Sequence, residues 1–395
     1  MAYSTGLFGS HEVSGARWRS AAWLGAVDAA SDVLVRRAGK FDLHIPRIPV
    51  LDKFLRNRYL KSLRGLHEAP AGDVVIAFSP EFAPLVREFP DAPLIYYVED
   101  AFNLMPGWSA ENECQHRYLV ERADLLLTCS EAMAREQPGN GPAKARILPN
   151  GVDFEFFAAS EGCACPADMS SIPHPRIGYT GSVNLKVDFG LVAELAEARP
   201  NWHWVFVGRI FLVDAASKDD GHQHIRDAYQ ACRSLPNVHF LGQREYADVP
   251  AYERHMDVNM MCYRTDGEGW WKAIDPLKTH EYLAVGLPIV AADQASVREY
   301  ADQIAIAYSP GQWLAEIEKA LAGHGVGTTR SRLARARRND WDTRVDLFEG
   351  WLADVVAKKS GLSEQVIFAT SETPTPNPQQ SASPSSRPTE PAFFR

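Results

Sequence analysis

The N-terminal part of the chain alternates short apolar runs with a segment of helical periodicity. The apolar runs occupy 72–80, 93–100 and 125–131, and the helical pattern occupies 114–124. Apolar runs that alternate with amphipathic helices are typical of parallel strands buried on both faces. The pattern is weaker before residue 70, where residues 3–9 are the candidate for a first strand.

A second series of strands and helices begins at Arg176. Apolar runs predict strands at 176–182, 202–209, 237–242, 257–263, 287–293 and 304–309. Helical patterns lie at 188–198, 247–256, 275–286 and 310–322. This order predicts a doubly wound parallel sheet, so the expected fold class is α/β with two Rossmann-like domains facing each other across a cleft.

Length and local composition indicate how the chain is divided. A chain of 395 residues is too long for one ordinary core, and a segment rich in Ala, Ser, Pro and Cys reads as a linker. The late segment 331–358 is helical, with a break expected near residues 339–340. The predicted parts are an N-terminal domain (1–157), the linker (158–175), a C-terminal domain (176–340), a last helix that can cross back to the first domain (341–358), and a disordered Pro/Ser/Gln tail (371–395).

Composition narrows the class of protein. The chain is 46% hydrophobic and 23% charged, as in globular proteins, and its net charge of −9 argues against a general nucleic-acid binder. The six cysteines have no disulfide-framework spacing, the N-terminus lacks a signal-peptide pattern, and no apolar run approaches the roughly 20 residues that span a bilayer. We therefore expect a reduced, cytoplasmic protein.

One charge in the predicted helix 275–286 is in an unfavourable place. Asp275 can cap this helix, Pro276 suits its first position and Gly286 can end it, but Lys278 then lies in the first turn. A cation there faces the positive end of the helix dipole unless an anion is bound. Arg209, at the end of a predicted strand, could meet Lys278 and the helix N-terminus at one strand-end crevice, a group that suits a diphosphate.

Glu281 follows Lys278 by three residues, so both project from one face of the helix. One interpretation is a surface ion pair. The other is a carboxylate that accepts hydrogen bonds from ribose hydroxyls while the lysine holds the phosphate.

Several segments together resemble the GT-B glycosyltransferases of the family 4 type, including the teichuronic-acid and capsule biosynthesis branch. They include "ERADLLLTCSEAMARE", "ILPNGVDFEFF" and "DPLKTHEYLAVGLPIVAAD", and the similarity extends over roughly residues 72–355. The resemblance implies a GT-B fold with an acceptor-side N-terminal domain and a donor-side C-terminal domain. It also implies transfer of a sugar from a nucleotide-diphosphate donor to an acceptor hydroxyl, in polysaccharide or glycoconjugate biosynthesis and without a further cofactor.

The resemblance assigns donor-site roles where the motifs match. Glu281 corresponds to the second glutamate of the family's E-x7-E motif, which binds the ribose, and Lys278 lies where a cation meets the pyrophosphate. Leu241 and Gly242 would hold the base through backbone groups, and Gly181 would lie beside the phosphates.

The sugar end of the donor site departs from the family pattern. The first glutamate of the motif is replaced by Ala273, and Asp266 or Glu268 is our hypothesis for a substitute. Lys186, in "NLKVD", matches the family's phosphate-binding Arg/Lys pair only loosely. Of Trp270 and Trp271, we expect one to pack in the core and the other to face the donor sugar.

The acceptor side offers Glu99 and Asp100 at the carboxyl end of a predicted strand. An acid there could take the proton from the acceptor hydroxyl, or Asp100 could merely cap the segment that follows. The basic segment 44–65 reads either as an amphipathic helix packed on the sheet or as a patch that contacts an anionic membrane leaflet and admits a lipid-linked acceptor.

The sequence favours a metal-independent reaction. No persuasive DxD motif occurs, so Lys278, Arg209 and the helix N-terminus would stabilise the charge on the leaving nucleotide. Two other functions stay open. One is a sugar-nucleotide epimerase on the same fold, and the other is a non-catalytic GT-B relative, for which Ala273 is the hint.

Overall fold

The structure is a computed structural model. It describes residues 74–359 apart from 88, 106–107, 213–220 and 267–268, together with the backbone of five short strands earlier in the chain. These strands are β1 (Tyr3–Ser4), β2 (His11–Val13), β3 (Ala16–Arg19), β4 (Trp23–Leu24) and β5 (Asp42–His44). β1 pairs antiparallel with β4 in a two-stranded sheet. Residues 5–9 of the candidate first strand at 3–9 lie outside the described residues. Residues 45–65 of the basic segment and the tail 371–395 lie outside the described residues.

The first domain contains a four-stranded parallel sheet in the order β6-β7-β8-β9. Its central strands are buried at every position, which accounts for their apolar sequences. The strands are β6 (Val75–Ala77), β7 (Leu94–Val98), β8 (Leu125–Thr128) and β9 (Ala145–Ile147). The helices are η1 (Pro80–Phe82), α2 (Ala83–Val86), η2 (Phe102–Leu104), α3 (Ala110–Arg122), α4 (Glu131–Arg135) and α5 (Gly141–Lys144).

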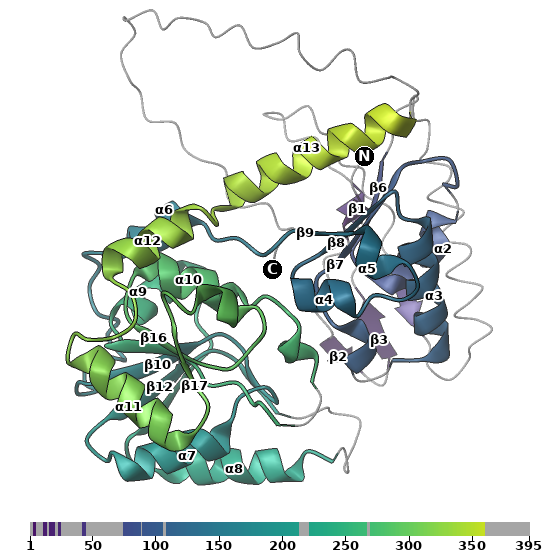
Figure 1. The fold of residues 1–395 in the computed structure, drawn as a ribbon. Coiled ribbons are helices and arrows are strands. Elements are labelled where there is room, and N and C mark those ends of the chain that lie inside the picture. The colour runs from purple at the N-terminus through teal and green to yellow at the C-terminus, as the bar shows by residue number, and fades with distance from the viewer. Residues whose placement is uncertain are drawn as a thin grey trace, which may run out of the picture.

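The second domain contains a six-stranded parallel sheet in the order β14-β12-β10-β15-β16-β17. Numbered along the chain, this is the 3-2-1-4-5-6 order of dinucleotide-binding folds, whose switch point lies between β10 and β15. Figure 1 shows α7, α8 and α11 on one face of the sheet and α9, α10 and α12 on the other. Ligands of such sheets bind at the carboxyl ends of the strands beside the switch point.

The elements of the second domain agree closely with the predicted series. The strands are β10 (Arg176–Thr180), β11 (Val183–Asn184), β12 (His203–Val207), β13 (Ile210–Phe211), β14 (Val238–Gly242), β15 (Val258–Met261), β16 (Ile289–Ala292) and β17 (Ala305–Ala307). The helices are α7 (Phe189–Ala198), α8 (Gln223–Ser234), η3 (Tyr246–Asp248), α9 (Val249–Arg254), η4 (Trp270–Lys272), α10 (Leu277–Val285), η5 (Val297–Tyr300) and α11 (Pro310–Leu321).

Two local expectations needed correction. The helix α8 was not predicted. The parallel pair β12 and β14 requires a crossover between the strands, and Ile225, Tyr229 and Cys232 recur at helical spacing in that segment. The other correction concerns the start of α10, where the N-cap is Pro276 and no side chain caps the helix. Asp275 does not cap it because its carboxylate binds Asn150 and His280 instead.

Two crossovers connect the domains. The first runs from β9 to α6 (Phe154–Ala158), and the second runs from α12 (Thr329–Arg337) to α13 (Trp341–Lys359). In Figure 1, α13 leaves the second domain and extends over the first. Its end lies against the first domain, where Lys359 Nζ is 3.2 Å from Asp124 Oδ1. In the part of the chain that the structure describes, no helix is long and apolar enough to cross a membrane.

Candidate functional site

The carboxyl ends of three neighbouring strands converge beside the switch point. The Gly181 amide donates to Val207 O at 2.8 Å, and the Gly208 amide donates to Gly242 O at 2.8 Å. A Cβ on Gly208 would lie only 2.0 Å from Gly181 O. Glycine is therefore required for the close approach of these strand ends, and the predicted residues Gly181, Leu241 and Gly242 belong to one continuous edge.

Lys278 lies directly against this edge. Its side chain is buried, and Nζ is 4.8 Å from the centre of the Tyr179 ring. Gly181 has φ +100°, and a Cβ there would lie 2.4 Å from Lys278 Nζ. The glycine thus makes room for the ammonium group, which brings together two of the residues predicted for the donor phosphates.

Lys186 is a second buried lysine at the same place. Its Nζ lies 5.2 Å from the ring centre of Trp270 and 5.3 Å from that of Tyr263. Burial, and then the charge of Lys278, hold the pKa of Lys186 well below its usual range, while Asp100 acts in the opposite direction. An anion bound between the two lysines would oppose this shift and favour the charged form of Lys186.

Glu99 and Asp100 follow β7 in the first domain, and both are half-buried. Burial, and then the neighbouring Asp100, raise the pKa of Glu99 to about 7. Burial also raises the pKa of Asp100, and Lys186 opposes that shift across the domain boundary. The 3-10 helix that follows has Ala101 as its N-cap without a side-chain capping bond, so Asp100 does not cap it.

Glu281 is half-buried on α10 and interacts electrostatically with Glu253 on α9. Glu253 is fully buried, and Thr180 Oγ1 donates to its Oε1 at 2.6 Å. Burial, and then Glu281, raise the pKa of Glu253 well above its usual value. The burial of Glu253 was not predicted from the sequence, because an acidic residue in a short amphipathic helix is expected on the exposed face.

The remaining predicted donor residues lie farther out. Arg209 is exposed, and its guanidinium carbon is 5.6 Å from the ring centre of Phe211. Asp266 is exposed and accepts two hydrogen bonds from Arg264, at 2.9 and 2.8 Å. Glu268 lies outside the described residues.

The segment around Ala273 packs against the first domain. Ala273 is buried, and its carbonyl accepts a hydrogen bond from Ser130 Oγ at the start of α4. Trp271 is also buried, with Nε1 donating to Arg264 O at 2.9 Å, so one of the two tryptophans packs in the core as expected. The half-buried Trp270 stands over Lys186.

Acidic, histidine and cysteine side chains do not gather into a metal site anywhere in the described residues. The charged groups gathered at the switch point are instead lysines from one domain and carboxylates from the other. This arrangement can bind a diphosphate and place a carboxyl group next to it.

Known proteins resemble this chain in sequence and in fold. Residues 174–323, the sheet domain that carries both lysines, match the family model described as Glycosyl transferases group 1. A curated relative from Bacillus subtilis (strain 168), "Putative teichuronic acid biosynthesis glycosyltransferase TuaH", is 27% identical over 232 residues, which are 57% of this chain and 55% of the relative. This chain therefore matches about half of that relative's length.

Solved structures share the fold. HepE of Anabaena in complex with UDP aligns with a TM-score of 0.58 at 19% identity, over 75% of this chain and 82% of that one. Sucrose-phosphate synthase from Thermosynechococcus elongatus aligns with a TM-score of 0.58 at 13% identity, over 82% and 84%. A UDP-forming trehalose-phosphate synthase from Burkholderia xenovorans gives 0.57 at 16% identity, over 77% and 78%. The resemblance to GT-B glycosyltransferases is thereby confirmed for the fold, and assignment to family 4 is compatible with these matches.

Proposed function

We propose that this protein transfers a sugar from a nucleotide-diphosphate donor to an acceptor hydroxyl. The chain has the GT-B fold, and its residues 174–323 match group 1 glycosyl transferases. The observation that carries the proposal is the pair of buried lysines, Lys186 and Lys278, at the switch point of the second sheet. Two ammonium groups match the two charges of a sugar nucleotide's diphosphate. The complex of HepE with UDP-glucose and the biosynthetic name of TuaH support the same reading.

In this proposal each predicted residue has a defined task. Lys278 and Lys186 hold the diphosphate and stabilise the charge that develops on the leaving nucleotide. Glu281 accepts hydrogen bonds from the ribose hydroxyls, and the backbone of Leu241 and Gly242 holds the base. Gly181 lets the phosphates approach the strand end, and Arg209 is an outer, exposed contact.

The acceptor lies on the first domain. Asp100 takes the proton from the acceptor hydroxyl, and Glu99 holds a proton beside it near neutral pH. The bond between the sugar's anomeric carbon and the diphosphate oxygen breaks, and the acceptor oxygen forms the new bond. The lysines replace a metal ion in this scheme, so EDTA should leave the rate unchanged, and loss of activity with EDTA would contradict that part.

Nucleotide binding tests the proposal directly. We expect isothermal titration with UDP, GDP, ADP and dTDP to show binding of at least one of them, and Lys278→Met to weaken it roughly 10- to 100-fold because a charge-assisted contact is lost. Lys319→Met, at an exposed lysine on α11, is the matched control and should bind as wild type does. No binding by wild type would favour the non-catalytic relative. Consumption of a sugar nucleotide without any acceptor, giving an epimer, would favour the epimerase.

We also propose a cytoplasmic location with peripheral contact to an anionic leaflet, through which a glycan or lipid-linked acceptor is reached. The support is the basic segment 44–65, in which six Arg/Lys stand against one acid. Flotation with liposomes tests this step, with anionic and with neutral lipid. Equal recovery with both lipids would remove it.

A further inference from the structure

The first crossover is held by both domains at positions only two residues apart. Tyr97 Oη, from β7 in the first domain, donates to Leu148 O at 2.9 Å. The Asn150 amide donates at 2.8 Å to Asp275 Oδ2 in the second domain, and Asn150 Nδ2 donates to Asp275 O at 2.5 Å. Pro149 alone separates the two anchors, so a rotation of the domains would turn this crossover at the bonds around Pro149.

The second crossover lies against the first. The Val152 amide donates to Asn339 O at 3.0 Å, and the Trp341 amide donates to Val152 O at 3.1 Å. A Cβ on Gly151 would lie 2.7 Å from the Trp341 ring. The two crossovers therefore move together, and glycine at 151 permits their close contact.

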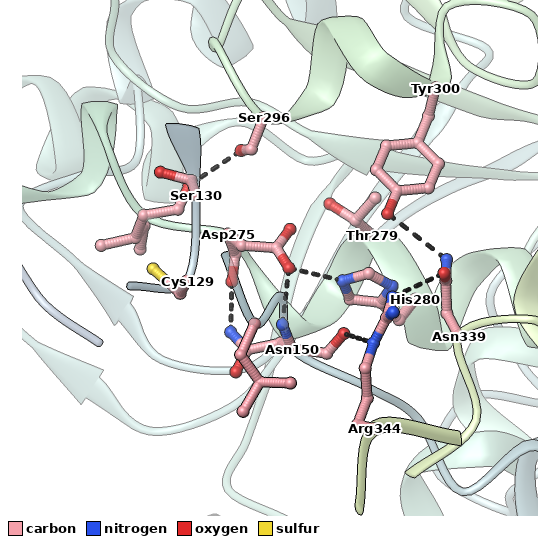
Figure 2. Close-up of polar contacts among 12 residues, drawn as sticks. Cys129, Ser130, Asn150, Asp275, Thr279, His280, Ser296, Tyr300, Asn339 and Arg344 are labelled. Atoms are coloured by element: carbon pink, nitrogen blue, oxygen red, sulfur yellow. Dashed lines mark hydrogen bonds and ion pairs between the residues drawn. The ribbon is translucent and has the colours of Figure 1, made fainter. Parts of the chain in front are cut away.

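Arg344 of α13 ties the two crossovers to each other. Its Nε donates to Asn150 O at 3.3 Å, and its Nη2 donates to Asn339 Oδ1 at 2.7 Å. Figure 2 shows Arg344 and Asn339 on one side of Asn150, and Asp275 on the other. We call Asn150, Asp275, His280, Asn339 and Arg344 the crossover latch.

The latch continues into α10. His280 Nε2 lies 2.8 Å from Asp275 Oδ2, the oxygen that also accepts from the Asn150 amide, as Figure 2 shows. His280 is fully buried and sits on α10 between Lys278 and Glu281. Any movement of α10 would therefore reach Asn150 through His280 and Asp275.

Burial makes this connection stiff. Asp275 is 3% exposed, and its second oxygen, Oδ1, has no hydrogen-bond partner among the described residues. The carboxylate therefore depends on the two donors at Oδ2, and the loss of either one leaves a buried charge poorly solvated. Asn150 and His280 cannot move apart without that cost.

We propose that Asp275 and His280 are positioning residues that couple nucleotide binding on α10 to rotation of the two domains about Pro149 and the start of α13. The inference rests on the proposed function, because it requires a diphosphate at Lys278. Neither residue touches the substrate in this scheme. They act by setting the angle between the lysines of the second domain and the carboxylates of the first.

The test measures two quantities for each variant. The ligand is whichever of UDP, GDP, ADP and dTDP binds wild type. The first quantity is its dissociation constant, and the second is the change in radius of gyration when it is added, measured by small-angle X-ray scattering. Wild type should become more compact. His280→Phe removes the donor to Asp275 and should abolish compaction and weaken binding about 5- to 10-fold, whereas His280→Gln can keep a donor and should retain both.

Arg344 supplies a variant outside α10. Arg344→Met should also lose compaction and weaken binding about 5-fold, although Arg344 lies on α13 and contacts the crossovers instead of α10. Arg338→Met, at an exposed arginine of the same crossover, is the matched control and should behave as wild type. A merely structural role for Arg344 would lower the melting temperature but leave affinity and compaction intact.

Failure of this inference is distinguishable from failure of the proposed function. Two results would overturn the coupling and leave the glycosyltransferase proposal standing. One is binding by wild type without compaction, and the other is compaction by His280→Phe or Arg344→Met with unchanged affinity. Absence of binding by wild type to every member of the panel would overturn the proposed function, and the coupling with it.

Discussion

At the scale of single residues, Asp100 of the first domain and Lys186 of the second interact electrostatically. Burial favours the neutral form of each group, whereas each charge favours the charged form of the other. Diphosphate bound to Lys186 would reduce its pull on Asp100 and make that carboxylate a better base. Proton acceptance is then strongest when the donor is present.

The role of Asp100 is testable by substitution with the isosteric amide. Asp100→Asn should lower kcat by about 100-fold or more, because general-base catalysis contributes on that order, while the donor dissociation constant changes little. Turnover is measured by release of the nucleoside diphosphate. Asp91→Asn, at an exposed position before β7, is the control. Turnover near the wild-type rate in Asp100→Asn would refute the base assignment.

Glu99 should make stability depend on pH. Its pKa is raised from 4.5 to about 7 in the folded protein, so the folded state binds the proton more tightly than the unfolded state between these values. Stability is then fully present below about pH 4.5 and falls as pH rises to about 7, by at most about 3 kcal/mol. Glu99→Gln should remove this contribution, so that its melting temperature, measured by calorimetry at pH 5 and pH 8, changes less than that of wild type. An equal change would contradict the shift.

Local rules singled out candidate residues whose roles stay predictions. Lys278 was chosen because a cation in a first helical turn conflicts with the dipole, and the structure places it in that turn beside Gly181. Lys186 matched the family's phosphate-binding pair only loosely, and its burial could not be predicted because it depends on Trp270 and Tyr263, which are distant in the chain. Asp275 was taken for a helix cap because its tertiary partners Asn150 and His280 leave no local sign.

At the scale of elements, the C-terminal end of α10 meets two requirements with one residue. Gly286 ends α10 at φ +81°, as the sequence predicted, and a Cβ there would lie 3.1 Å from Thr329 Cγ2 on α12. This glycine therefore satisfies both a left-handed turn and a packing limit.

Gly323 offers a matched comparison, since its φ is +79° and nothing lies within 4 Å of a Cβ. Gly323→Ala should cost about 1 kcal/mol through backbone strain alone. Gly286→Ala should cost about 1 kcal/mol more, because Thr329 and Leu333 must shift. Urea denaturation measures both variants. Equal losses would show that α12 yields without cost.

Element prediction worked wherever a strong period was present. The break predicted at residues 339–340 separates α12 from α13, and Asp188 is the N-cap of α7, whose helical pattern was predicted from 188. The short strands β11 and β13 were not predicted, since two residues carry no period and pair only because the strands β10 and β12 bring them together.

At the scale of the whole molecule, α13 continues the second crossover onto the first domain. Its first turn belongs to the crossover latch, and its later turns pack on the first domain. Trp351 is half-buried there, with the Arg146 guanidinium carbon 5.3 Å from its ring centre. The sequence predicted that this helix can cross back to the first domain. It could not predict the packing partners, because they lie on β8 and β9, which come together only in the folded sheet.

Removing the tryptophan should release α13 from the first domain without unfolding either sheet. Trp351→Ala loses roughly 2 kcal/mol of packing and cation–π contact, so amides of α13 should exchange about 10-fold faster or more, while those of α12 keep their wild-type rates. Hydrogen exchange followed by mass spectrometry measures both helices in one experiment. Leu347→Ala, at a position 39% exposed on the same helix, is the control and should exchange as wild type does. Faster exchange in α12 as well would show that the two helices open as one unit, and the first domain would then not be what holds α13 in place.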